Sequence, residues 1–230
     1  MIHGVVKQGD TANGVETLRD RYRREPGLRE RKKRKAMRHI QDTALQLFAV
    51  HGFRSVTIER VADEAEVSPS TVYRYFGTKE QLVLYDESDP ELLRRFDHLL
   101  VEHSPIEALR RVLGELADFL PAGSPTNGAP SGGEPFGVDS LLRTRIHFLL
   151  TEPSVRKALG AEVDQVEALL RDILAIHTGL GIDSLRLRVF VSALVHALIA
   201  LIEYWHDTDY REPFEDLVEE TFTMLDSLEL

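Results

Sequence analysis

The apolar residues of this chain recur at helical spacing almost throughout, and no segment shows the sustained alternation of a strand. Near the N-terminus, Ala36, Ile40, Ala44 and Leu47 lie three or four positions apart, so they form one apolar helix face, and Gly52 is placed to end that helix. The pattern predicts an all-α fold. The further expected helices span residues 58–65, 69–76, 104–120, 139–150, 153–176, 183–205 and 213–228, together with one long helix that begins near residue 79.

Two short helices separated by a tight turn, over residues 58–76, form the most informative unit. Thr57 suits the N-cap of the first, Ser68 followed by Pro69 suits the start of the second, and Gly77 stops it. This spacing predicts a helix-turn-helix, whose second helix enters the DNA major groove. That helix carries more hydroxyl, aromatic and guanidinium groups than packing requires. The expected DNA contacts, including phosphate contacts at helix starts, are Thr57, Ser68, Ser70, Thr71, Tyr73, Arg74, Tyr75 and Lys79.

The net charge of the whole chain and the charge of its N-terminal third lead to opposite expectations about DNA binding. The formal net charge of −10 over 230 residues argues against a nucleic-acid partner. Residues 1–80 hold 16 Lys/Arg and 11 Asp/Glu, a balance of +5, whereas residues 81–230 hold 12 and 27, a balance of −15. Between Arg19 and Arg38 eleven basic residues oppose three acidic ones. This asymmetry indicates polyanion contact at the N-terminal end, although a solvated charged leader has the same composition.

The composition excludes several chemistries. Without cysteine the chain has no disulfide, thiolate metal site or catalytic thiol. Its nine histidines include no pair at i, i+4 metal spacing, so no metal and no cofactor are expected. Ser192 and His196 lie one turn apart in an apolar helix and are expected to satisfy each other or a carbonyl rather than act as catalysts. The longest apolar run, residues 189–202, is shorter than the roughly 20 residues of a membrane span, so no membrane partner is expected.

Within residues 31–83, seven short segments form a combined pattern: Ala44–Phe48, Gly52–Phe53, Val56–Ile58, Val61–Ala62, Val67–Ser68, Thr71–Phe76 and Thr78–Glu80. This pattern strongly resembles the tetracycline-repressor (TetR) family of bacterial regulators. By that resemblance, the residues placed where the family touches operator DNA are Thr57, Ser70, Thr71, Tyr73, Tyr75 and Lys79. Glu66 departs from the pattern, because the turn of the family usually has glycine there. If the turn needs a positive φ, this departure costs about 1 kcal/mol.

The resemblance implies a three-part organisation: a flexible basic arm (1–28), a helix-turn-helix DNA-binding domain (29–78) and a helical effector-binding and dimerisation domain (79–230) with a flexible loop at 121–138. The expected effector contacts are Leu113, Leu116, Phe119, Leu142, Arg143, Ile146, His147 and Ile173. Arg143 and His147 share a helix face and can receive an anionic head group, unless that face is simply solvated surface. Residues 143–155 are similar to the subgroup with an acyl-CoA-like ligand-binding domain and to regulators found near mycofactocin genes.

The last two helices suit dimerisation in the family's manner, as a four-helix bundle with a twofold mate. The helix over residues 183–205 is apolar nearly all round, and such a helix must be buried on all sides, which a monomer of this size hardly arranges. A homodimer is therefore expected. The expected interface residues are Leu194, Leu198, Leu201, Trp205, Leu217, Val218, Phe222 and Leu225.

Together these patterns predict a cytoplasmic, ligand-responsive repressor rather than an enzyme. It is expected to bind a palindromic operator in double-stranded DNA as a homodimer, and to leave it when a small, largely apolar effector binds. One alternative is an enzyme or carrier that kept the helical fold and lost DNA binding. Another is an adaptor that uses the basic arm without sequence preference.

Overall fold

The computed structural model describes residues 27–85, 89–117 and 138–226, and within these ranges every regular element is a helix. The predicted all-α fold is therefore confirmed. The predicted arm and the predicted loop lie outside the described residues except at their edges, and so does Phe119, near the end of the helix predicted over residues 104–120. The elements are α2 (Leu28–His51), η1 (Phe53–Ser55), α3 (Ile58–Glu64), α4 (Pro69–Phe76), α5 (Gln81–Leu84), α6 (Asp89–Leu99), α7 (Pro105–Ala117), α8 (Val138–Thr151), α9 (Pro153–Thr178), α10 (Leu185–Asp207) and α11 (Phe214–Leu225).

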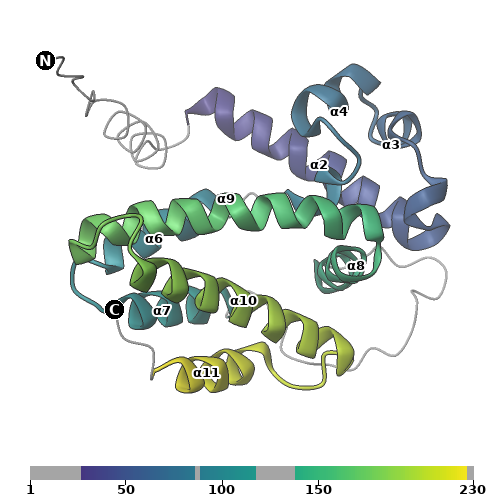
Figure 1. Cartoon of the computed structure of the whole chain (residues 1–230). Coiled ribbons are helices and arrows are strands. Elements are labelled where there is room, and N and C mark those ends of the chain that lie inside the picture. Colours follow the sequence, from purple (N-terminus) through teal and green to yellow (C-terminus); the bar gives the residue numbers. More distant parts are fainter. Residues whose placement is uncertain (1–26, 86–88, 118–137, 227–230) are drawn as a thin grey trace, which may run out of the picture.

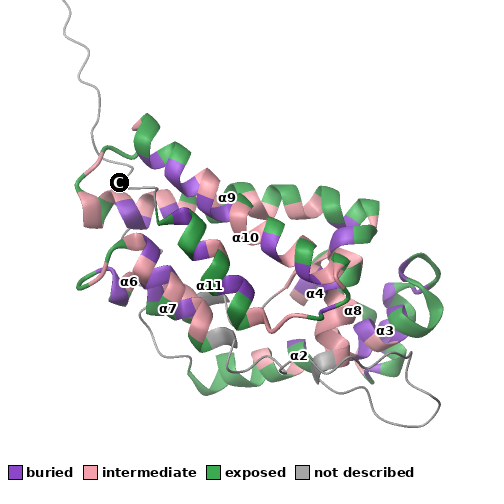
Figure 2. Ribbon diagram, turned by 90° about the horizontal axis from the view of Figure 1, so that it is seen from below, coloured by how far each residue is buried: buried purple, intermediate pink, exposed green. Residues whose placement is uncertain are grey.

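The buried apolar residues form two cores. Figure 1 shows α2, α3 and α4 on one side of the long α9, with α7, α10 and α11 on its other side. Fully buried members of the first core are Ile40, Phe48, Val61, Val72 and Leu82. Fully buried members of the second core are Leu174, Leu187, Leu194 and Phe222. In Figure 2 the buried positions are the purple segments that recur along the helices. The helix-turn-helix therefore has a core of its own, separate from that of the C-terminal helices.

The first helix is longer than its packing requires. Its first buried side chain is Met37, so residues 28–36 extend beyond the core. This extension carries much of the basic cluster found in the sequence: Arg29, Arg31, Lys32, Lys33, Arg34 and Lys35. At the other end of α2, Gly52 has φ 79° and its N–H donates to the carbonyl of Phe48. Glycine adopts a positive φ without the steric cost of a side chain, so it ends the helix where the sequence predicts.

The long helix expected from residue 79 is wrong, because α5 ends after a single turn. Tyr85 leaves the helix with ψ 129°. The carbonyls at this end are bonded by side chains from other helices instead of by a further turn. Gln41 of α2 donates to the carbonyls of Leu82 and Tyr85 (3.1 and 2.7 Å), and Arg145 of α8 donates to those of residues 83 and 84 (2.7 and 2.9 Å). Since α5 packs into the first core, that core extends past the boundary predicted at residue 78.

The turn between α8 and α9 connects the two cores. Phe148 of α8 packs against Phe48 and Phe53 of the first core, with ring centroids 5.9 and 6.0 Å apart. Val155, in the first turn of α9, is fully buried in the same core. Because α8 and α9 also pack against α10, this turn holds the helix-turn-helix onto the C-terminal helices.

Among the described helices, α10 alone is long and apolar enough to cross a membrane by length and composition, with a mean hydropathy of 2.0 over 18 residues. This helix is longer than the apolar run at residues 189–202 from which no membrane partner is expected, and a core helix can have the same length and composition. In the structure α10 packs against α8, α9 and α11. Only 33% of its most apolar window is buried, and Val189 and Tyr204 remain 56% and 50% exposed. One side of α10 is therefore left uncovered by the described chain.

Candidate functional site

The helix-turn-helix is held by two side-chain caps that the sequence predicts. The Thr57 hydroxyl accepts from the N–H of Arg60 (3.2 Å) at the start of α3. The Ser68 hydroxyl accepts from the N–H of Thr71 (3.2 Å) at the start of α4. Each cap satisfies a backbone donor that has no partner within its helix, so the two short helices begin at fixed positions.

The turn between α3 and α4 places a non-glycine residue in the left-handed region. Glu66 has φ 52°, and its N–H donates to the carbonyl of Asp63 (3.1 Å). The next N–H, from Val67, reaches back to the carbonyl of Ala62 (2.9 Å). This turn therefore does need a positive φ at position 66, and the energetic cost expected there for a residue other than glycine applies to Glu66. The turn keeps the glycine-type geometry and stores backbone strain of about 1–2 kcal/mol.

Helix α4 separates its apolar face from its polar face. Val72 is fully buried and Phe76 is 6% exposed, which anchors the helix in the first core. The predicted DNA-contact residues lie on the other side: Ser68, Ser70, Tyr73 and Arg74 are exposed, and Thr71 and Tyr75 are half-buried. The structure therefore brings together a surface of hydroxyl, phenol and guanidinium groups, the groups that read base edges and phosphates.

Several groups on this surface already contact one another. The Ser68 hydroxyl lies 2.9 Å from those of both Ser70 and Thr71. The guanidinium of Arg74 lies 5.0 Å from the centroid of the Tyr75 ring. The Tyr73 hydroxyl donates to the carboxylate of Glu59 on α3 (3.4 Å). Hydrogen bonds from the backbone, from Thr57 and from Tyr73 lower the pKa of this carboxyl.

Glu59 is a functional candidate that the sequence reasoning missed. Its carboxylate accepts a hydrogen bond from the Tyr73 hydroxyl, so it influences the orientation of that hydroxyl on the outward face of α4. The two residues are 14 positions apart, on different helices. No local spacing pattern relates them, so only the crossing of α3 and α4 reveals the contact.

Lys79, another predicted DNA contact, is bonded to the backbone of the protein itself. Its ammonium donates to the carbonyls of Phe53 and Val56 (2.8 and 3.0 Å) and lies 4.3 Å from the centroid of the Phe53 ring. Partial burial lowers the pKa of this ammonium. In this structure Lys79 ties the segment after α4 to the α2–α3 connection rather than facing outward with Tyr73.

Neither of the two hollows described below, between α10 and α11 and between α8, α9 and α10, is lined by a predicted effector residue. Leu142 packs half-buried against the second core, Ile146 and Ile173 are buried within it, and Leu113 packs half-buried against it. The side chain of Leu116 is not among the described ones, and Phe119 lies outside the described residues. The apolar candidates that can be placed therefore belong to the second core or pack against it, and their contact with an effector stays a prediction.

Arg143 and His147 face the C-terminal end of α10. The Arg143 guanidinium lies 4.6 Å from the centroid of the Tyr210 ring, whose hydroxyl donates to the carbonyl of Arg143 (3.3 Å). Nδ1 of His147 lies 3.3 Å from Nε2 of His206. Partial burial, and then the proximity of His206, lower the pKa of His147. On this face Arg143 and His147 contact Tyr210 and His206, and the expected anion site stays a prediction.

The predicted dimer residues mostly pack the monomer's own core. The buried members are Leu194, Leu201, Trp205, Leu217, Val218, Phe222 and Leu225, and Leu198 is half-buried against the same core. The apolar stripe of α11 lies against α7 and α10, so it closes the second core of a single chain. Leu194 and Phe222, at 1% and 0% exposed, are already covered within one chain, whereas the part of the others in a dimer interface stays a prediction.

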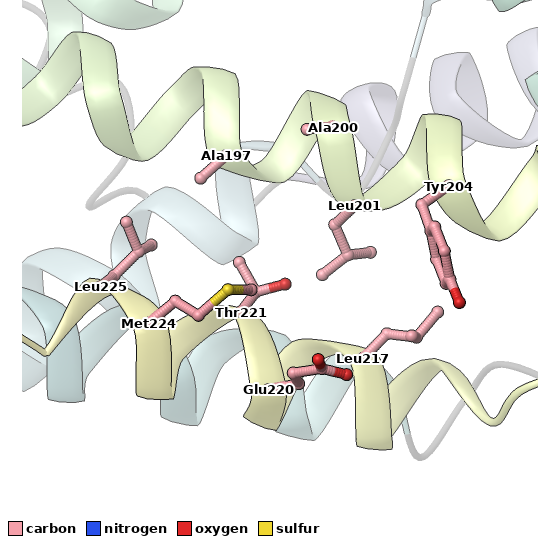
Figure 3. A pocket seen from close by; sticks show the side chains of 9 residues that line it. All are labelled: Ala197, Ala200, Leu201, Tyr204, Leu217, Glu220, Thr221, Met224 and Leu225. Atoms are coloured by element: carbon pink, nitrogen blue, oxygen red, sulfur yellow. The ribbon is translucent and has the colours of Figure 1, made fainter.

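A groove between α10 and α11 remains open to a partner. It has a volume of about 500 Å³, and Figure 3 shows its side chains pointing toward one another from the two helices. Three of the predicted residues, Leu201, Leu217 and Leu225, line it. Its other lining residues are Ala197, Ala200, Tyr204, Glu220, Thr221 and Met224. Tyr204 is 50% and Met224 is 65% exposed, so the groove carries large apolar groups that the described residues leave uncovered.

The Ser192–His196 pair has the structural role expected from the sequence. Nδ1 of His196 lies 3.0 Å from the carbonyl oxygen of Ser192, one turn earlier in α10. The imidazole is satisfied by its own helix backbone, so it is not arranged to activate the serine hydroxyl.

Two family profiles match this chain. The profile of bacterial regulatory proteins of the tetR family matches residues 40–85, which include α3, the turn and α4. The profile of the MftR C-terminal domain matches residues 136–228, from the start of α8 past the end of α11. The chain belongs to the TetR family.

Relatives of this TetR-family chain are transcriptional regulators. It is 29% identical over 165 residues to TcmR, an HTH-type transcriptional regulator of Streptomyces glaucescens. This match covers 69% of this chain and 67% of TcmR. It is 39% identical over 44 residues to MftR of Mycobacterium tuberculosis, a match that spans 19% of this chain and 22% of MftR. The match of residues 136–228 to the MftR C-terminal domain confirms the resemblance to mycofactocin-associated regulators in that part of the chain.

Solved TetR-type structures share the fold. FadR of Bacillus halodurans aligns with a TM-score of 0.54 at 18% identity, over 89% of this chain and 97% of its own. FadR of Thermus thermophilus, a TetR-family repressor solved with lauroyl-CoA, aligns with a TM-score of 0.53 at 22% identity, over 84% and 95%. At these identities the likeness concerns the arrangement of helices.

Proposed function

We propose that this TetR-family regulator is a homodimeric repressor that binds a palindromic operator and is released by a small, largely apolar effector. The observation that carries the proposal is the outward face of α4. There Ser70, Tyr73 and Arg74 are exposed on a short helix fixed by the Ser68 cap and the Glu66 turn. A preorganised helix of this composition suits the major groove, where its N-terminal residues meet base edges.

The uncovered side of α10 supports the homodimer. The groove between α10 and α11 presents apolar groups from both helices, and a second copy placed on it by a twofold axis buries them in both chains at once. Two recognition helices about one DNA turn apart then match two half-sites of a palindrome.

The relatives and solved neighbours support a small-molecule effector. The FadR structures of Thermus thermophilus and Bacillus subtilis were solved with lauroyl-CoA and stearoyl-CoA. An acyl-CoA-like effector for this chain accords with those neighbours and with the match of residues 136–228 to the MftR C-terminal domain. The relatives are regulators rather than enzymes, and a repressor of this kind acts in the cytoplasm, where its operator DNA lies.

Selection of bound duplexes from a random DNA library tests the proposal. A dimer that reads a palindrome enriches an inverted repeat and protects both half-sites in a footprint. Uniform coating supports the adaptor instead, and catalytic turnover without specific binding supports the enzyme or carrier. A sedimentation mass near 26 kDa at micromolar concentration overturns the homodimer.

Replacement of Tyr73 by alanine tests the recognition surface. Tyr73 is 48% exposed, so truncation of its ring is expected to abolish operator binding while leaving the melting temperature nearly unchanged. Ile176→Ala is the matched control, because that side chain is also large, apolar and 46% exposed but lies on α9, far along the sequence from the DNA-binding domain and outside the α10–α11 groove. Gel-shift affinity retained in Tyr73→Ala removes the central claim about α4.

A further inference from the structure

A second hollow lies between α8, α9 and α10, away from the residues expected to bind an effector. It has a volume of about 350 Å³. It is lined by Leu159, Gly160 and Val163 on α9 and by Ile199 and Ala200 on α10. Gly160 and Ala200 are exposed and supply almost no side-chain volume, so among the described residues the larger side chains around them form the walls of a slot that is open to solvent on this side.

Gly160 accounts for much of this space. A Cβ atom built on Gly160 meets no atom within 4 Å, so the position is open toward its surroundings. Glycine inside a helix costs roughly 1 kcal/mol relative to alanine, and nothing in the backbone of α9 requires it here. The slot is therefore kept open by a residue that does not favour the helix.

One end of the slot is charged. Arg156 lies there, with one guanidinium nitrogen donating to the carbonyl of Leu150 (2.9 Å) and another 3.7 Å from a carboxylate oxygen of Glu203. The Arg156–Glu203 separation exceeds hydrogen-bond length, and the side chains are 58% and 43% exposed. A guanidinium has five N–H donors, so Arg156 retains capacity for a carboxylate bound in the slot.

The slot touches the segment that carries the DNA-binding domain. Leu149, Leu150 and Arg156 line it, whereas their neighbours Phe148 and Val155 are packed against the first core. The α8–α9 turn therefore has one face in the slot and the other face in the helix-turn-helix domain. A molecule that enters the slot contacts this turn directly.

We propose that the α8–α9–α10 slot is an effector site for a small apolar molecule that carries one carboxylate, with the chain along Gly160 and Ala200 and the carboxylate at Arg156. A volume of about 350 Å³ lies within the range of small-molecule sites. Binding moves the α8–α9 turn relative to α10 and so changes the position of the helix-turn-helix. This inference rests on the proposed function for its regulatory consequence, but ligand binding itself is measured without DNA.

Titration calorimetry on the full chain, with sodium octanoate as the probe and 1-octanol as its neutral counterpart, tests the site. Octanoate is expected to bind saturably and more tightly than 1-octanol. Gly160→Leu fills the slot and is expected to weaken octanoate binding at least tenfold. Gly114→Leu is the matched control, because Gly114 is also a helix-interior glycine, in α7, with no atom within 4 Å of a built Cβ. It is expected to leave binding unchanged.

Two charge variants test the end at Arg156. Arg156→Gln is expected to lower octanoate affinity to that of 1-octanol. Glu203→Gln is expected to raise octanoate affinity, because it removes the carboxylate that competes for the same guanidinium. Equal octanoate binding by the wild-type chain, Gly160→Leu and Arg156→Gln overturns the proposal, as does the absence of saturable binding.

Further measurements distinguish an effector site from a dimer contact in the slot, and ligand binding from the proposed repressor function. Saturating octanoate is expected to reduce operator affinity at least tenfold in the wild-type chain and less than twofold in Gly160→Leu. A Gly160→Leu chain that sediments as a monomer while the wild type is a dimer shows a second copy in the slot, and overturns the effector assignment. A chain that binds octanoate but no specific DNA refutes the proposed repressor function and leaves the ligand site intact.

Discussion

Glycine at position 66 is expected to stabilise this protein. Glu66 holds φ 52° in the turn between α3 and α4, where an L-residue costs about 1–2 kcal/mol because its Cβ crowds the backbone. Its side chain is exposed, and no hydrogen bond or ion pair of its carboxylate is seen in the described part of the chain. Glu66→Gly therefore removes strain without removing a contact.

The gain is smaller than the strain, because glycine also increases the conformational freedom of the unfolded chain by about 0.5–1 kcal/mol. The difference leaves a net stabilisation of about 0.5–1 kcal/mol. For a chain of this size that corresponds to a rise of about 2 °C in melting temperature. Thermal unfolding followed by circular dichroism measures it, with operator affinity expected to remain within twofold.

Glu66→Ala is the matched control, because alanine removes the carboxylate but keeps the Cβ that causes the strain. Its melting temperature is expected to stay close to that of the wild type. If Glu66→Gly is no more stable than Glu66→Ala, backbone strain at this turn is not a measurable cost and the reasoning is refuted.

Three further changes test contacts that only the folded chain reveals. Lys79→Met is expected to lower operator affinity and the melting temperature, because the ammonium bonds backbone carbonyls. The salt dependence of DNA binding is expected to stay unchanged. If the slope of log affinity against log salt concentration falls by about one, Lys79 contacts a phosphate instead. Arg145→Met is expected to destabilise the chain by about 2–3 kcal/mol, measured by urea unfolding, since it leaves the carbonyls that end α5 without their charged donor. The pKa of His147 is lowered in the folded state, so the unfolded chain binds the extra proton first and stability falls as pH drops below about 6.5; His147→Gln is expected to flatten this fall in melts between pH 5 and 8.

Local chemistry determined the first third of the molecule. The caps at Thr57 and Ser68 and the positive-φ turn at Glu66 each depend on residues within a few positions, so their spacing in the sequence predicts them. The apolar face of α4 buries Val72 and leaves its polar face outward for the same local reason. The helices, the helix-turn-helix and the family were therefore available from the sequence alone.

Contacts between distant segments decided the rest. The break after α5 depends on carbonyls bonded from α2 and α8, and the inward position of Lys79 depends on carbonyls 23 and 26 residues away. An apolar stripe shows that a helix face must be buried but not against what, so Phe222 was assigned to a partner although α7 and α10 already enclose it. The slot at Gly160 is likewise a property of two facing helices. The sequence determined which helix faces are apolar. Only the tertiary structure decided which of these faces are covered by other helices of the chain and which the described residues leave exposed.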